Sequence, residues 1–219
     1  MVFLIQNSQN RDTSALQIKL DEEPEEYSGY MSSDLIRLLG YMNDVECQDR
    51  LRGFLAIDEI QTKFDASIAL ARNGQTVDAA IWEELAASND FRIELYEELE
   101  AMDKEALFPT KYRTQAYFAE AYLYNYASDD YSPSEIVLLG ERKATFKGSL
   151  ARFFIFKVAY GEEGEENAES YLGMVGPFSL DEKEWHSTDA LTMIYWEEMF
   201  DKKKVDEWFR SLLKSAQEE

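Results

Sequence analysis

The chain has very little of the residue types that enzymes most often use for covalent or metal-assisted chemistry. Its 219 residues include one cysteine, Cys47, and one histidine, His186. A single cysteine cannot form an internal disulfide, which favours a reducing compartment and a cytoplasmic location. Cys47 lies among acidic residues, which raise the pKa of a thiol, so a structural thiol is favoured over a nucleophile.

Metal-binding and catalytic motifs are also missing. Lys183 stands three residues before His186, so the Glu-x-x-His pair of di-iron bundles does not occur. Glu182 and His186 are spaced to share a helix face, but a zinc site needs three or four protein ligands. The sequence contains no G-x-S-x-G, Walker or G-x-G-x-x-G motif. We therefore expect a protein that is not an enzyme and that uses no cofactor.

Long apolar runs are absent as well. The chain opens on Met1–Ile5, five apolar residues, whereas a bilayer-spanning helix needs about 20. Charged residues interrupt every later apolar stretch, and the opening has no basic flank or cleavage site of a signal peptide. The sequence therefore predicts no membrane span.

Charge of one sign dominates the chain. Acidic residues outnumber basic residues by 44 to 22, which gives a net charge of −22. The excess lies mainly in residues 1–100 and 151–200. Nucleic-acid backbones and anionic membranes would repel such a surface. We therefore expect a protein partner with a basic surface and no direct binding to nucleic acid, and the oligomeric state stays open.

The most acidic loop, 161–169, contains weak candidate ligands for a cation. Its sequence GEEGEENAE lacks the alternating ligands of a calcium-binding hand. The candidate ligands are Glu162, Glu163, Glu165 and Glu166.

Apolar periodicity predicts helices in the first part of the chain. A stripe from Ile57 to Ala71 indicates an amphipathic helix that ends at Asn73-Gly74. Short helices that begin near Thr76 and Ser88 form an antiparallel hairpin, and Thr114 caps a further helix. Shorter helices are expected at 13–20 and from Ser32 or Ser33 to Gly40, separated by an acidic linker at 21–29.

The pattern then changes to strands. EIVLLG, KATF, ARFFIFKVAY and SYLGMVGPF are rich in β-branched and aromatic residues. Phe154, Phe156 and Val158 share one face of their strand, while Phe153 and Ile155 share the other, so this strand belongs in the centre of a sheet. Helices are expected from Ser179, from Ser187 or Thr188 and from Asp201.

These patterns together predict an α+β fold. It is mostly helical, with a small three- to four-stranded antiparallel sheet at about 135–176 that is packed by C-terminal helices. The expected domains are an N-terminal segment with an acidic linker at 1–29, a helical region at 30–130, and the sheet with its closing helices at 131–219.

Three hypotheses for the function stay open. The first is a non-catalytic protein-interaction module, because tyrosine is a frequent hot-spot residue in interfaces. The second is a DNA mimic that inhibits a DNA-binding protein through the acids of 83–105, and the third is a small-molecule or metal-binding protein. The candidate partner-binding residues are Tyr117, Tyr122, Tyr124, Tyr126, Glu94, Glu97 and Glu98.

Two stretches of the chain resemble known families. FLIQNSQNRDTSALQIKLDE, residues 3–22, resembles the segment that follows the last transmembrane helix in the low-affinity iron permease family. The helices that would form a permease are absent, so a fragment, a fusion or a mis-set gene start are open explanations, and the resemblance does not imply transport.

The second resemblance covers about 70–185 and includes LFPTKYRTQAYFAE, residues 107–120, and the strand SYLGMVGPF. It is to the C-terminal region of uncharacterised bacterial HEAT-repeat proteins. It implies a helical-repeat remnant, with a HEAT-like hairpin within 30–130, that carries a small sheet and has no known reaction.

Overall fold

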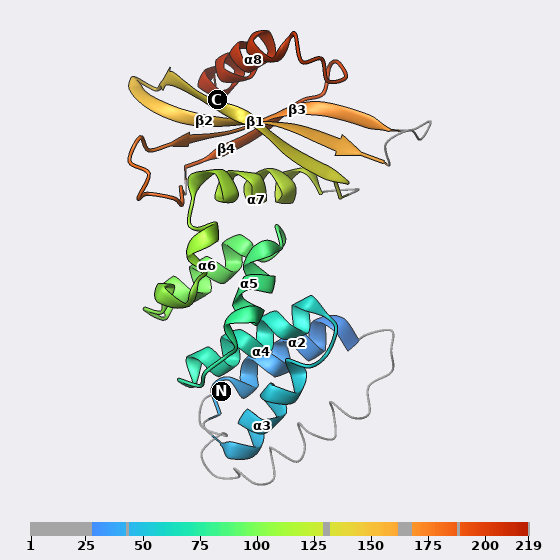
Figure 1. Cartoon of the computed structure of the whole chain (residues 1–219), viewed down its shortest axis with the longest axis vertical. Coiled ribbons are helices and arrows are strands. Elements are labelled where there is room, and N and C mark those ends of the chain that lie inside the picture. Colours follow the sequence, from blue (N-terminus) through green and yellow to red (C-terminus); the bar gives the residue numbers. More distant parts are fainter. Residues whose placement is uncertain (1–27, 43, 129–131, 162–167, 188, 219) are drawn as a thin grey trace. The chain divides into compact units, whose positions relative to one another are not determined.

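The computed structural model describes residues 28–42, 44–128, 132–161, 168–187 and 189–218 (Figure 1). The helix expected at 13–20, most of the linker at 21–29 and the permease-like segment 3–22 lie outside these residues. So do the candidate cation ligands Glu162, Glu163, Glu165 and Glu166.

The α+β fold is confirmed. Within the described residues there are seven α-helices and one four-stranded antiparallel sheet. The chain divides into two compact units. We call the first the helical unit (residues up to Leu85, with Ala101–Asp103) and the second the sheet unit (Ala86–Glu100 and Lys104–Glu219).

The helical unit is built around α4. Its helices are α2 (Ser28–Leu39), α3 (Val45–Phe54), α4 (Ile60–Arg72) and α5 (Ala79–Ala87), of which α5 ends in the sheet unit. The predicted stripe is confirmed within α4, where Phe64 and Ile68 are buried. The predicted end is also confirmed, because Asn73 follows α4 and Gly74 has a φ of +69°, a left-handed conformation that glycine adopts without strain.

Two details of the helical unit differ from the prediction. Ile57 precedes α4 and is 43% exposed, so it is not part of the buried stripe. The helix expected to begin at Ser32 or Ser33 begins earlier, at Ser28, and ends at Leu39 as expected. Side-chain caps are a local preference, and packing of a longer apolar face can move a helix start by a turn.

The sheet unit contains α6, α7, the four strands and α8. The elements are α6 (Arg92–Ala101), α7 (Gln115–Ala127), β1 (Glu135–Phe146), β2 (Ser149–Tyr160), β3 (Glu169–Phe178), β4 (Leu191–Tyr195) and α8 (Val205–Glu218). The strands pair in the order β1-β2-β3-β4, an antiparallel meander. Thr114 caps α7 as predicted, because its hydroxyl accepts a hydrogen bond from the Tyr117 N–H at 3.3 Å.

Turn chemistry joins β1 to β2. Lys147 and Gly148 both have positive φ values, 45° and 87°, which a two-residue type I′ hairpin turn requires. Phe146 and Ser149 close this turn as the last partners in the ladder. A bulge between Leu138 and Gly140 interrupts the same ladder further along.

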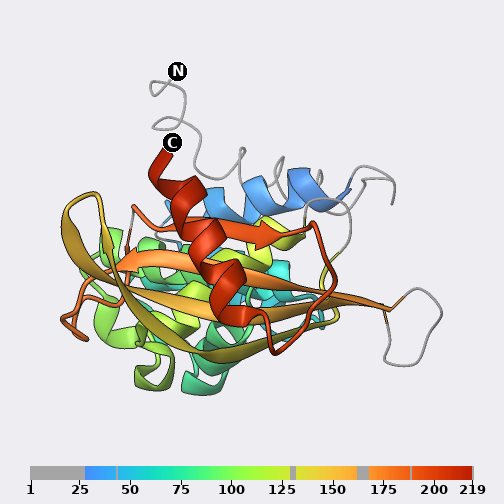
Figure 2. The same cartoon turned by 90° about the horizontal axis from the view of Figure 1, so that it is seen from above.

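The sheet is covered on both faces. Helix α7 packs on one face and α8 crosses the other (Figures 1 and 2). Phe154, Phe156 and Val158 of β2 pack against α7, while Phe153 and Ile155 join the core beneath α8. The prediction that this strand is apolar on both faces and lies inside the sheet is confirmed.

Two of the predicted C-terminal helices are wrong. Residues 179–187 form turns and irregular structure, and β4 occupies Leu191–Tyr195, so the sheet extends past residue 176. Side chains alternate along β4, with Met193 and Tyr195 toward α8 and Ile194 toward α7. Pairing with β3 therefore decides the structure of this short apolar run. Asp201 begins a turn, and α8 follows at Val205.

Candidate functional site

Helix α7 is shorter than the sheet face that it covers. The 12 residues of β2 span about 40 Å at 3.3 Å per residue, while the 13 residues of α7 span about 20 Å. Ala119, Leu123 and Ala127 of α7 belong to one core cluster with Phe154, Phe156 and Val158 of β2. The C-terminal ends of α7 and β2 lie together, since Tyr160 is hydrogen-bonded to Ala127, so the part of β2 that α7 does not cover lies beyond the N-terminus of the helix. The two ends of α7 have distinct surfaces.

At the C-terminus of α7 lie three aromatic rings, which we call the aromatic surface: Tyr160, Tyr171 and Trp196. The centroids of Tyr171 and Trp196 are 4.8 Å apart, and the Tyr160 centroid lies 6.1 Å from that of Trp196. The Tyr160 hydroxyl donates to the carbonyl of Ala127, the last residue of α7, at 3.0 Å. The rings thus begin where the helix ends, and Trp196 is 51% exposed.

A carboxylate lies beside these rings, because the Tyr171 hydroxyl donates to Glu169 at 2.7 Å. On the opposite face of the sheet, Tyr195 stacks on Trp208 of α8 and its hydroxyl donates to Glu197 at 3.0 Å. The hydrogen bond to Glu169 is the main cause that raises the pKa of Tyr171 above its ordinary value. Exposed aromatic rings and negative charge therefore lie together at this end of the sheet.

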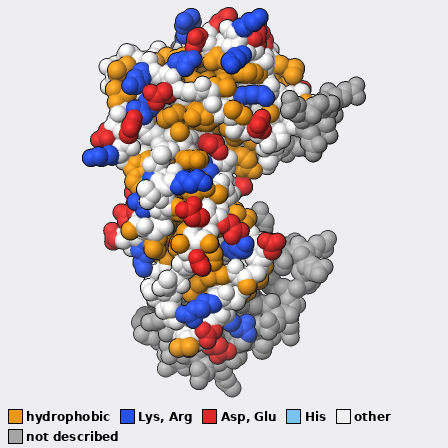
Figure 3. Space-filling model, in the orientation of Figure 1, with side chains coloured by type: hydrophobic (Ala, Val, Ile, Leu, Met, Phe, Trp, Pro, Cys, Tyr) orange, Lys and Arg blue, Asp and Glu red, His pale blue; other side chains and the backbone are white. Residues whose placement is uncertain are grey.

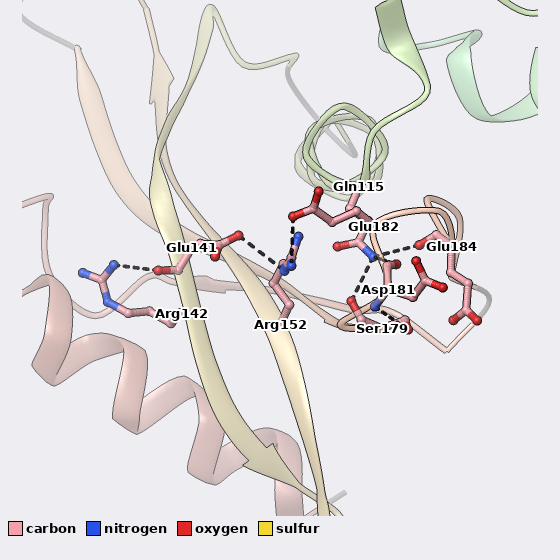
Figure 4. A network of polar contacts seen from close by, with 8 residues as sticks. All are labelled: Gln115, Glu141, Arg142, Arg152, Ser179, Asp181, Glu182 and Glu184. Carbon is pink, nitrogen blue, oxygen red and sulfur yellow. Dashed lines mark hydrogen bonds and ion pairs between the residues drawn. The ribbon is translucent and has the colours of Figure 1, made fainter. Parts of the chain in front are cut away.

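At the N-terminus of α7 lies a pocket of about 550 Å³, which we call the Arg152 pocket. Its walls come from α7, from β1 and β2, and from the segment after β3 (Figure 4). They include Arg113, Gln115, Leu138, Glu141, Arg152 and Glu182. Two guanidinium groups and two carboxylates therefore line one opening, beside apolar surface.

The predicted partner-binding tyrosines lie along α7 but do not form one surface. The Tyr117 ring packs below the guanidinium of Arg92, with the Cζ atom 5.1 Å from the ring centroid. Tyr122 and Tyr124 are half-buried, whereas Tyr126 is 51% exposed. Of these four tyrosines, Tyr126 is the one next in sequence to Ala127. The Ala127 carbonyl accepts a hydrogen bond from Tyr160 of the aromatic surface.

The predicted glutamates lie on α6, where Glu94 and Glu98 are half-buried. Glu97 is exposed, and its carboxylate is 3.2 Å from Nε2 of His186. The ring centroid of His186 is in turn 6.1 Å from that of Tyr122. The structure therefore brings Glu97 and Tyr122 together around the single histidine.

Two residues of the aromatic surface, Tyr171 and Trp196, were not among the predicted site residues. The sequence contains one signal for them, which is that aromatic residues stand at the ends of consecutive strands.

Buried tyrosines predict a loss of stability at alkaline pH. Burial is the main cause that raises the pKa of both Tyr96 and Tyr122 to about 12, and Glu100 and Glu97 add to it. An unfolded tyrosine ionises near pH 10, so the stabilisation is complete below pH 10 and is lost as the pH rises to about 12. We expect a loss of about 2 kcal/mol for each tyrosine, measured by urea unfolding from about pH 9 upward.

The control for this prediction is Tyr122→Phe, which removes one ionisable group and keeps the ring. Its free energy of unfolding should fall less steeply between pH 10 and about pH 12 than that of the wild type. Equal slopes for the two proteins would contradict the assigned role of Tyr122.

The described residues contain no group of three or more histidine, cysteine, aspartate or glutamate side chains arranged to hold a metal ion. His186 instead packs against aromatic rings, with centroid distances of 5.8 Å to Tyr96 and 5.7 Å to Phe118. Cys47 is buried, and burial raises the pKa of its thiol, as do Asp44 and Glu46. The thiol is therefore a poor nucleophile.

Comparison with known proteins gives one family match. Residues 1–76 match the model of the low affinity iron permease family, which extends the resemblance of residues 3–22 through α4. No curated protein and no solved structure matches the chain. The resemblance to HEAT-repeat proteins stays a prediction. Among the described residues, every helix is too short or too polar to cross a bilayer. The chain is thus similar to the permease family over roughly a third of its length.

Proposed function

We propose that the chain is a non-catalytic protein-interaction module whose aromatic surface binds a basic segment of a partner protein. The observation that carries the proposal is the exposed Trp196 ring packed against Tyr171, whose hydroxyl is bonded to Glu169. Tryptophan and tyrosine supply much of the binding energy in protein interfaces, and their faces attract lysine and arginine side chains. The Glu169 carboxylate and the net charge of −22 favour the same partner.

The DNA-mimic alternative has less support. A mimic needs a regular row of available carboxylates, since duplex DNA carries about one charge per 1.7 Å. Several of the acids considered for it have internal partners: Glu84 pairs with Lys63 at 2.7 Å, and Glu100 accepts from the Tyr96 hydroxyl at 3.0 Å. Acidic and basic side chains are also intermixed on the face of each unit seen in Figure 3.

The experiment that tests the proposal is selection of binders from a display library of random peptides. We expect selected peptides to be enriched in lysine and arginine, and their binding to weaken as salt rises. Trp196→Ala should weaken the best peptide by about 30-fold, the effect of losing a hot spot worth about 2 kcal/mol.

The matched control is Leu150→Ala. Leu150 is 56% exposed, but it lies at the β1–β2 hairpin, about 33 Å along β2 from Tyr160. This variant should bind the selected peptide as the wild type does. Selection of acidic or uncharged peptides, or equal affinity of Trp196→Ala and the wild type, would show that the proposed surface is wrong. The cytoplasmic location expected from the single cysteine belongs to the same proposal.

A further inference from the structure

The Arg152 pocket contains a buried hydrogen-bond acceptor that has no partner. Gln115 is the first residue of α7 and is 3% exposed. Its Nε2 donates to three backbone carbonyls, those of Ser179, Asp181 and Glu184, at 2.8–3.0 Å. These three acceptors fix the orientation of the amide. The oxygen Oε1 must then point away from them, and it has no hydrogen-bond partner.

A buried donor without a hydrogen-bond partner lies in the same pocket. Arg152 of β2 is 8% exposed, and its Nε has no hydrogen bond. Two carboxylates form ion pairs with the guanidinium: Glu141 lies 3.4 Å from Nε, outside hydrogen-bond geometry, and Glu182 accepts from a terminal nitrogen at 3.5 Å. Figure 4 shows Gln115 and Arg152 pointing toward one another from α7 and β2. Buried polar groups are nearly always hydrogen-bonded, so these two atoms are candidate contacts for a molecule that enters the pocket.

The other walls restrict the chemistry of that ligand. Arg113 and Arg152 carry two positive charges, and Glu141 and Glu182 carry two negative charges. The opening also lies at the N-terminus of α7, where the helix dipole favours a negative group. A simple anion would leave the Gln115 oxygen unsatisfied, and a simple cation would leave Nε of Arg152 unsatisfied. Leu138, Ala116 and Phe154 add an apolar wall.

We propose that the Arg152 pocket binds a small amino acid or amino-acid derivative that has an apolar side chain. Its amino group donates to Oε1 of Gln115 and to the carboxylates of Glu141 and Glu182. Its carboxylate or carbonyl oxygen accepts from Nε of Arg152, which lines the same pocket as the first residue of α7. Its side chain packs against Leu138 and Phe154. The pocket lies at the opposite end of α7 from the aromatic surface, so the two proposals can fail separately.

The test uses the full chain and four related probes in isothermal titration calorimetry. L-leucine and leucinamide carry both groups, isoamylamine lacks the carbonyl group, and isocaproate lacks the amine. We expect leucine to bind at least ten-fold more tightly than isoamylamine or isocaproate. Leucinamide distinguishes recognition of a carboxylate from recognition of a carbonyl oxygen. In NMR spectra, leucine should shift the Nε–H signal of Arg152 and the amide signals of Gln115 and Ala116.

Matched variants locate the site. Arg152→Lys keeps the positive charge and removes Nε, so leucine affinity should fall at least ten-fold. Arg142→Lys is the same substitution at a residue that pairs with Asp206 of α8 at 2.9 Å, and it should leave the affinity unchanged. Glu182 has an 81% exposed side chain, so Glu182→Gln should preserve the fold and weaken leucine several-fold.

Three results would overturn the proposal. The first is that none of the four probes binds, which would leave the pocket filled by water alone. The second is that isoamylamine or isocaproate binds as tightly as leucine. The third is that the folded variants at Arg152 and Glu182 bind leucine as tightly as the wild type. If Arg152→Lys does not fold, the leucine affinity of Glu182→Gln alone tests the proposal.

Discussion

Replacing Arg92 by alanine is expected to lower the unfolding free energy of the sheet unit by about 3–5 kcal/mol. The side chain is 2% exposed, and its guanidinium donates to three backbone carbonyls. These belong to Ala86 at 2.7 Å, Ala87 at 2.9 Å and Tyr117 at 2.8 Å. Alanine would leave three buried acceptors without their donor and would also open a cavity.

The position of Arg92 adds to this effect. Ala86 and Ala87 are the last residues of α5, where the helix dipole favours a positive charge and the final carbonyls lack helical partners. The guanidinium also lies between two rings, with its Cζ 5.4 Å from the centroid of Tyr112 and 5.1 Å from that of Tyr117. Burial lowers the pKa of Arg92 from its ordinary value, but the nearby Glu120 and the two tyrosines act in the opposite direction.

The measurement is urea unfolding of the full chain, followed by tyrosine and tryptophan fluorescence. Arg92→Lys keeps the charge but cannot reach three carbonyls in the same geometry, so its loss should be intermediate. Arg142→Ala removes an exposed arginine that contacts Asp206 and should cause a much smaller change. A loss for Arg92→Ala no larger than for Arg142→Ala would show that the buried network does not stabilise the unit.

The sequence predicts those parts of the fold in which side-chain periodicity and local turn chemistry agree. The stripe of α4 is regular and ends in Asn73-Gly74, so both the helix and its end could be predicted. The two-faced apolar pattern of β2 similarly places this strand inside the sheet. Thr114 is a strong N-cap residue, and it caps α7 in the structure.

The errors and omissions of the sequence-based prediction arise where contacts between residues far apart in the chain decide the local structure. Leu191–Tyr195 is too short to distinguish a strand from a helix, and pairing with β3 settles it. The capping-box pattern at Ser179 is not followed by a helix, because the carbonyls of this segment turn toward Gln115, which lies 64 residues earlier than Ser179. The Arg152 pocket depends on the same contact. No spacing in the sequence relates Gln115 to Arg152.

Asp65→Ala is the second substitution for which a large loss is expected, about 3–5 kcal/mol, here in the helical unit. Asp65 of α4 is 0% exposed. Its carboxylate accepts from the Ser33 hydroxyl, from Nε of Arg37 at 2.6 Å and from the Gln61 amide at 3.1 Å. Ser33 and Arg37 lie on α2, so one buried carboxylate holds α2 against α4.

Hydrogen exchange can separate this explanation from general destabilisation. If Asp65 holds the two helices together, Asp65→Ala should increase exchange most in α2, because α4 also packs against α3. Asp58→Ala is the control, since Asp58 is fully exposed and its carboxylate is 3.9 Å from Lys63. It should change exchange in neither helix. Helices α2 to α4 lie within the permease-like residues 1–76. Equal protection of α2 in Asp65→Ala and the wild type would mean that apolar packing alone, and not this carboxylate, joins α2 to α4.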